Sequence, residues 1–227
     1  MNFRSTIIIL FLLVGSISLS AQDFEITGDS VGDVRIGMTV GEAKAAMNSV
    51  SFRRVSDGEG IPLIGAYIKG VRVFTIYAGE ESGDAPINEN AGIEFIEVWH
   101  RTFRTTEGVY VGMKVSEVEK KIGKLQQIFM SEIESREFAD FSRKTPGLQY
   151  RLSSPNGEAG IYPDGEMMAK DYDPDATIFS ISVMGIDIMD AESIGGIGIG
   201  STEPEVYAAA GPDSFVDLEK GEDFVLE

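Results

Sequence analysis

The chain has 227 residues, with 19 basic side chains, 37 acidic side chains and a formal net charge of −18 at pH 7. It contains no cysteine, which excludes disulfides, thiolate metal sites and cysteine nucleophiles. The acidic surface disfavours nucleic acid and anionic lipid as partners, and the single histidine argues against zinc sites that need two histidines.

The first 21 residues have the three-part pattern of a secretory signal peptide. Arg4 supplies positive charge, residues 7–14 form an unbroken apolar run, and Ala21 is a small residue at the predicted cleavage point. The alternative, a transmembrane anchor, requires about 18 apolar residues or more, and this run is shorter. We therefore expect cleavage after Ala21, export to the periplasm or the medium, and no membrane span once the leader is removed.

A pattern centred on a glycine occurs three times, at Gly37, Gly112 and Gly200. In each copy apolar residues alternate before the glycine, and a short amphipathic segment follows it. The alternation predicts a short strand, the glycine predicts a tight turn, and the amphipathic segment predicts a helix. The predicted helices lie near residues 39–48, 114–122 and 202–210.

Capping residues mark the start of the predicted helices. In the first and third copies a threonine is followed three residues later by a glutamate, which is the spacing of a capping box. These pairs are Thr39 with Glu42 and Thr202 with Glu205. In the second copy Lys114 replaces the threonine, so this helix depends on Glu117 and is expected to be the most weakly capped.

Strand-like segments follow the first two predicted helices. They span residues 52–56, 62–69, 71–78, 93–101, 127–133, 137–141, 148–152 and 178–184. Lys69 and Gly70 predict a tight hairpin between two of these strands. Apolar and polar side chains alternate along residues 148–152, which predicts a sheet that packs on one face only.

The predicted fold class is α+β, with tandem units that each pack a short helix on an antiparallel β-meander. We place two units at residues 22–104 and 105–190, and a partial third unit at 191–227. The third unit has too few residues after its helix for a second meander. Its terminal strands therefore join another unit's sheet, or residues 24–27 complete it.

The three glycine segments resemble the start of a known secreted module. The first, from Gly37, is Gly-Met-Thr-Val-Gly-Glu; the second, from Gly112, is Gly-Met-Lys-Val-Ser-Glu-Val; the third, from Gly200, is Gly-Ser-Thr-Glu-Pro-Glu-Val. They are similar to the helix-on-sheet domains of the lipoprotein BamE (the SmpA/OmlA family) and to the repeats of the β-lactamase inhibitor protein. The resemblance implies a helix-on-sheet fold. The lipid-bearing cysteine is absent, so neither an anchored role nor any functional residue carries over.

Three aspartates, Asp171, Asp173 and Asp175, alternate just before the last of these strands. Oxygen ligands at every second position are typical of the start of a calcium loop. An EF-hand requires glycine at its sixth position and glutamate at its twelfth, where Ala176 and Ser182 stand. We interpret the segment as a solvated turn, with weak calcium binding as the alternative.

His100 lies in a predicted strand, and no Gly-x-Ser-x-Gly turn of a serine nucleophile accompanies it. We interpret it as a packing residue. Its neighbour Trp99 is expected in the core; the alternative is an exposed patch with Arg101 and Arg104 that suits a protein or glycan partner. The glycine-rich residues 195–200 lack the lysine of a Walker loop, so no nucleotide cofactor is expected.

These observations favour an exported, non-enzymatic module, inhibitor-like or otherwise binding, whose partner is another protein or an envelope or extracellular ligand. We expect no catalytic residue, cofactor or resident metal. The motif residues are assigned structural roles: Gly37, Thr39, Glu42, Gly112, Glu117, Gly200, Thr202 and Glu205. The alternatives are a small carboxylate-dependent hydrolase and a structural envelope protein. An exposed aromatic row on a free sheet face would favour binding; a cleft with two carboxylates, one with a raised pKa, would favour the enzyme.

Overall fold

The computed structural model describes residues 24–185, apart from 59, 80–82 and 132–134, together with two short strands near the C-terminus. These two strands are β16 (Phe215–Val216) and β17 (Val225–Leu226), which pair antiparallel with each other. The expected signal peptide lies outside the described residues. So do Gly200, Thr202 and Glu205, and with them the third predicted helix.

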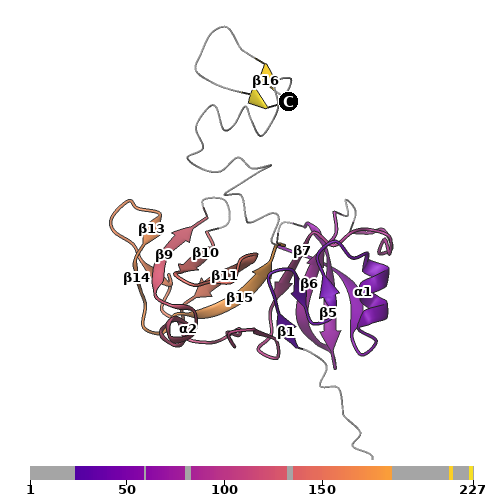
Figure 1. The fold of residues 1–227 in the computed structure, drawn as a ribbon, viewed down its shortest axis with the longest axis horizontal. Helices are drawn as coiled ribbons and strands as arrows, with labels where there is room; N and C mark the ends of the chain where they lie inside the picture. The colour runs from indigo at the N-terminus through magenta and orange to yellow at the C-terminus, as the bar shows by residue number, and fades with distance from the viewer. Residues whose placement is uncertain are drawn as a thin grey trace, which may run out of the picture.

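The main feature of the structure is an antiparallel sheet of nine strands (Figure 1). Its first half is a meander that follows helix α1 (Val40–Ala46). The strands of this half are β4 (Ser51–Ser56), β5 (Pro62–Ile68), β6 (Val71–Tyr77) and β7 (Phe95–Val98). Lys69 and Gly70 connect β5 to β6 with φ angles of 49° and 82°, and a two-residue type I′ turn requires positive φ at both positions. The predicted hairpin is therefore confirmed.

The second half is a meander that follows helix α2 (Val115–Ile122). Its strands are β9 (Leu125–Met130), β10 (Glu137–Phe141), β11 (Leu148–Ser153) and β15 (Thr177–Val183). A short strand, β13 (Met168–Ala169), extends the sheet beyond β9, while β12 (Gly160–Ile161) and β14 (Asp171–Tyr172) form a separate pair. The two halves join where β15 pairs with β7, with Val98 opposite Ile181.

A second, four-stranded sheet lies beside the main one. It contains β1 (Glu25–Ile26), β2 (Ser30–Val31), β3 (Val34–Arg35) and β8 (Arg104–Thr105) in the order β3-β2-β1-β8. The pairing of β1 with β8 is parallel, whereas the other two pairings are antiparallel. The chain at residues 25–26 is therefore tied to the segment between the two meanders.

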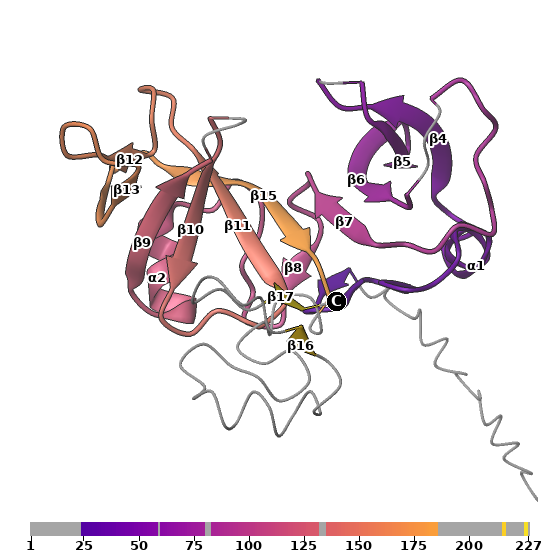
Figure 2. The same cartoon turned by 90° about the horizontal axis from the view of Figure 1, so that it is seen from above.

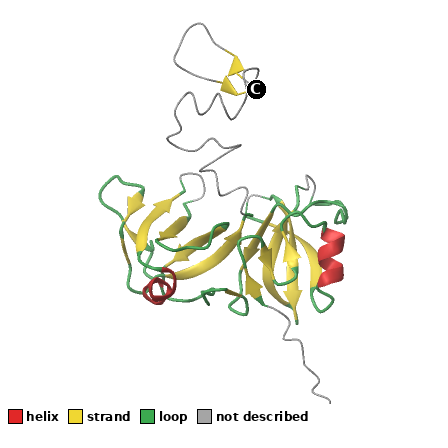
Figure 3. Cartoon of the chain, viewed as in Figure 1, coloured by secondary structure: helices red, strands yellow, loops and turns green. Residues whose placement is uncertain are grey.

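The predicted α+β fold class of tandem helix-on-sheet units is wrong, because the protein is predominantly β. The two described helices have only seven and eight residues, and Figure 3 shows how little of the chain they occupy. The strands expected in separate units form one continuous sheet. The pairing of β7 with β15 satisfies backbone groups that separate units would have left unpaired at their edges. No helix of the described part is long and apolar enough to span a membrane.

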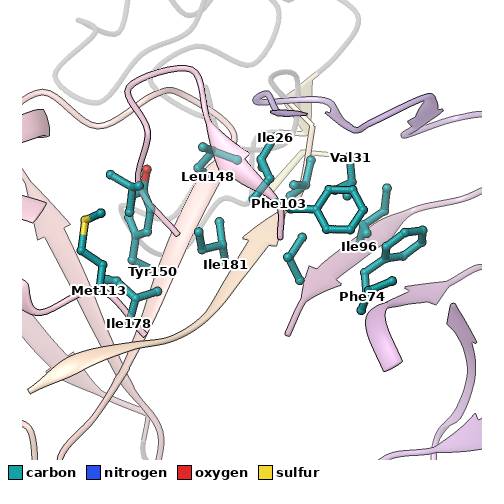
Figure 4. Packing of buried hydrophobic residues seen from close by; sticks show 14 of the residues in the cluster. Ile26, Val31, Phe74, Ile96, Phe103, Met113, Leu148, Tyr150, Ile178 and Ile181 are labelled. Atoms are coloured by element: carbon teal, nitrogen blue, oxygen red, sulfur yellow. The ribbon is translucent and has the colours of Figure 1, made fainter. Parts of the chain in front are cut away.

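The hydrophobic core lies on one face of the main sheet, and its buried side chains come from both halves (Figure 4). Phe74 of β6 contacts Phe103 edge to face, with ring centroids 5.7 Å apart, and Tyr150 of β11 belongs to the same cluster. Burial alternates strictly along Leu148–Ser153, so the predicted one-sided packing of this strand is confirmed. Polar and aromatic side chains are consequently directed to the opposite face of the sheet.

Candidate functional site

The two described glycine segments make the same backbone hydrogen bonds. The Gly37 N–H donates to the Ile93 carbonyl at 2.7 Å, and the Gly112 N–H donates to the Ile178 carbonyl at 2.7 Å. In each case the accepting residue, Ile93 just before β7 or Ile178 of β15, donates its own N–H to the carbonyl of the methionine after the glycine. Both glycines have positive φ, +84° and +90°, a conformation that glycine adopts without strain. These residues fasten the start of each helix to the main sheet.

The capping residues also have structural roles. The Glu42 N–H donates to Thr39 Oγ1 at 3.2 Å, and the Thr39 N–H donates to Glu42 Oε2 at 2.8 Å, so the predicted capping box is present. The hydrogen bond from the Thr39 backbone holds the pKa of Glu42 below its ordinary value. Lys114 provides no side-chain cap, as expected, and Glu117 lies in the first turn of α2.

Two of the three aspartates, Asp173 and Asp175, are engaged by protein groups. Asp173 Oδ2 accepts hydrogen bonds from Ser154 and Asn156, and its Oδ1 accepts from the Asp175 N–H at 2.7 Å. Asp175 pairs with Lys114 at 2.9 Å. Within the described ranges, no group of three or more histidine, cysteine, aspartate or glutamate side chains is placed to hold a metal ion.

The surroundings of Trp99 differ from the expected ones. The expectation of core burial is wrong, because its ring is only partly buried and lies on the open face of the sheet. The alternative patch is also not formed as expected, because Arg101 and Arg104 lie over the ring of Tyr110. The guanidinium over Trp99 is that of Arg72, with Cζ 5.2 Å from the ring centroid. His100 Nδ1 makes a local hydrogen bond with Thr102 Oγ1 at 2.7 Å.

The open face of the main sheet is hollowed into a cleft of about 660 Å³, which we call the sheet cleft. Seen from above (Figure 2), β9–β11 and β4–β6 rise on either side of the central strands β7 and β15. The lining side chains come from the end of β4 and the turn after it, from β5, β6, β7, β10, β11 and β15, and from positions just after β7 and just before β10. Those that define its chemistry are Asp57, Arg72, Glu97, Trp99, Arg136 and Arg151.

A row of polar side chains crosses the floor of the sheet cleft. Thr75 lies opposite Glu97, Glu97 opposite Ser182, and Ser182 opposite Gln149, on four neighbouring strands. Directly opposite residues of antiparallel strands share one face of the sheet, so these side chains form a continuous line. Thr75 Oγ1 accepts a hydrogen bond from Trp99 Nε1 at 2.9 Å, which fixes the orientation of the indole ring.

Glu97 is the central titratable group of this floor. Its Oε1 accepts a hydrogen bond from Ser180 Oγ at 2.6 Å. Burial raises the pKa of Glu97 above its ordinary value, although the hydrogen bond from Ser180 and the positive charges of Arg151, Arg136 and Arg72 act in the opposite direction. Desolvation therefore outweighs the combined attraction of three guanidinium groups.

A β-bulge adds an aromatic ring beside the sheet cleft. Arg151 pairs with Ser180 and Leu152 pairs with Ile178, so Phe179 is an extra residue in β15. Phe179 is 40% exposed, and its ring meets Trp99 at 90° with centroids 5.6 Å apart. Arg151 Cζ lies 4.6 Å from the Phe179 centroid. The rings of Trp99 and Phe179 thus contact each other, and each ring has an arginine guanidinium over it.

The chain has a distant likeness to a solved structure. No family model matches the chain, and no curated protein does. The crystal structure of the uncharacterized protein yfeY from Escherichia coli is similar with a TM-score of 0.45 and 16% sequence identity, over 70% of this chain and 99% of that one. A likeness this distant carries no argument about function. The resemblance to BamE and to the β-lactamase inhibitor protein stays a prediction.

Proposed function

We propose that the protein is an exported, non-enzymatic binding module and that the sheet cleft is its binding surface. The observation that carries the proposal is the gathering of Trp99, Phe179 and three arginines on the open face of the sheet. Tryptophan and arginine are enriched among the residues that dominate binding energy at interfaces. The volume of the cleft also falls in the range of ligand-binding sites.

Side chains of the sheet cleft hold one another in place. Trp99 is fixed by its hydrogen bond to Thr75 and by its contact with Phe179. Glu97 is fixed by Ser180. A binding surface whose side chains are already ordered loses little conformational entropy when the partner arrives. Such ordering supports a recognition surface over a purely structural face.

Export and the class of partner are parts of the same proposal. The pattern of residues 1–21 supports a location in the periplasm or the medium. The partner is then another protein or an envelope or extracellular ligand. An inhibitor-like role is consistent with the resemblance of the glycine segments to the β-lactamase inhibitor protein.

Capture of the partner by cleft variants tests the proposal. Immobilised protein is incubated with the native envelope and medium fractions, and the bound material is compared for wild type, Trp99→Ala and Phe179→Ala. Tyr110→Ala is the matched control. Tyr110 also lies under arginines, but these are Arg101 and Arg104, which do not line the cleft, whereas Phe179 contacts the cleft residues Trp99 and Arg151. The proposal expects both cleft variants to lose a species that the control retains. Retention by both folded cleft variants contradicts it.

One observation favours a second candidate, a carboxylate-dependent hydrolase. Glu97 has a raised pKa, as a general acid requires, and Asp57 is a second carboxylate in the cleft lining. Asp57 Oδ1, however, accepts the Ile61 N–H at 2.8 Å and so stabilises its own turn. Glu97→Gln separates the two candidates. If the protein is a hydrolase, wild type turns over glycoside substrates and Glu97→Gln does not. If it is a binding module, wild type shows no turnover and the Glu97→Gln variant still captures the partner.

A further inference from the structure

The sheet cleft concentrates positive charge in an acidic protein. Arg72, Arg136 and Arg151 line it together with two carboxylates, those of Glu97 and Asp57. The whole chain, by contrast, has 37 acidic and 19 basic side chains. An acidic ligand is therefore repelled by most of the surface and attracted to the cleft, which favours one defined mode of docking.

The arginines are arranged to receive a carboxylate. Arg72 and Arg151 lie over the rings of Trp99 and Phe179, and these two rings contact each other. The contacts Arg72–Trp99, Trp99–Phe179 and Phe179–Arg151 thus link two guanidinium groups in one continuous series. A guanidinium placed over a ring keeps its N–H donors at its edge, where they can bind a carboxylate in bidentate fashion.

We propose, on the basis of the function proposed above, that the sheet cleft binds an acidic side chain of an extended peptide segment of the partner. The carboxylate lies between the guanidinium groups of Arg72 and Arg151. An apolar residue next to it in the segment packs against Ile61, which is 42% exposed at the cleft wall. A short projecting segment suits this site, because a broad acidic surface would meet the acidic remainder of the protein.

Two other ligand classes fit the geometry less well. A sugar ring stacks on an open aromatic face, but the rings of Trp99 and Phe179 are taken up by Arg72, Arg151 and each other. A phosphate carries up to two negative charges and would lie beside the Glu97 carboxylate on the same floor. A singly charged carboxylate with an apolar neighbour meets less repulsion there.

Trp99 is the only tryptophan of the chain, so its fluorescence reports directly on the cleft. We would titrate the full protein with two acetylated and amidated octapeptides that share one phenylalanine and differ only in aspartate against asparagine beside it. The aspartate peptide is expected to bind saturably. The asparagine peptide is expected to have at least about tenfold lower affinity, because charge-assisted hydrogen bonds are lost.

Arginine variants locate the carboxylate. Arg72→Gln and Arg151→Lys are each expected to lower the affinity for the aspartate peptide about tenfold. Arg151→Lys does so because lysine keeps the charge but loses the bidentate geometry. Arg104→Gln is the matched control, since Arg104 lies 4.3 Å from the Tyr110 centroid and does not line the cleft. It is expected to leave the affinity unchanged. Circular dichroism melts establish that each variant is folded.

Several results overturn the inference. Equal binding of both octapeptides does so. Saturable binding of oligogalacturonate or inorganic phosphate, with no response to either peptide, assigns the cleft to another ligand. If no peptide binds while Trp99→Ala and Phe179→Ala still lose the captured partner, the acidic-segment inference is wrong and the binding function stands. If those variants retain the partner, the binding function itself fails.

Discussion

Replacing the motif glycines by alanine tests whether they serve the turn that fastens each helix to the sheet. Gly37 and Gly112 have φ angles of +84° and +90°, and a Cβ added at either would meet no atom within 4 Å. The cost of Gly37→Ala and of Gly112→Ala therefore comes from backbone conformation alone. That cost is about 1–2 kcal/mol for a residue with a side chain. Because both turns make the same hydrogen bonds, the two costs are expected to agree within about 0.5 kcal/mol.

Gly92→Ala is the matched control. Gly92 has the same open surroundings without a positive φ, so alanine there is expected to be neutral or to stabilise the protein by up to about 1 kcal/mol. Urea unfolding measures the three differences, and thermal melts should fall by roughly 2–8 °C for the two motif variants only. If either motif variant is as stable as the Gly92 variant, the turn does not require glycine and the structural role assigned to the motif is wrong.

Four further variants test the helix cap, the core, Glu97 and His100. Thr39→Ala is expected to lower the free energy of unfolding by about 1 kcal/mol through the lost cap, measured by urea unfolding. Phe74→Ala should cost about 3–5 kcal/mol by the same measurement, because the ring is fully buried. The pKa of Glu97 is raised in the folded protein, so its charged form opposes folding. Glu97→Gln should therefore stabilise the protein at pH 7. At about pH 4 the carboxyl is protonated, and the substitution should have little effect on stability. His100→Ala should leave partner capture and the melting curve unchanged, and loss of capture without loss of stability would place His100 in the site.

Local features of this fold are predictable because local physics determines them. The Lys69-Gly70 turn requires two positive φ angles, and the sequence places glycine and a tolerant residue there. The Thr39 capping box follows from side-chain reach over three residues. The eight strands predicted after the first two helices are all present, with boundaries shifted by a few residues. Burial alternates strictly along two of them, β10 and β11.

The assembly of these elements is not predictable in the same way. Alternation along a strand says which face is buried but not which strand lies beside it, and the pairing of β7 with β15 makes one sheet from two expected units. The strand expected at residues 109–111 is absent, and the two described helices are short beside one continuous sheet, so the protein is predominantly β.

The sheet cleft is equally hidden in the sequence. Its arginines, Arg72, Arg136 and Arg151, come from three separate segments, and no local pattern in the sequence predicts that they line one cleft. The bulge that brings Phe179 beside Trp99 breaks the period of two and so has no alternation signal.

Site-specific photocrosslinking tests the central claim, that the sheet cleft binds the partner. Benzoylphenylalanine is placed at Phe179 beside the cleft or at Ile161, which is 58% exposed in the β12–β14 pair outside it. Both proteins are irradiated in the native envelope and medium fractions. The account predicts a discrete crosslinked product from position 179 and none from position 161. Equal products from both positions, or a product from 161 alone, would contradict it.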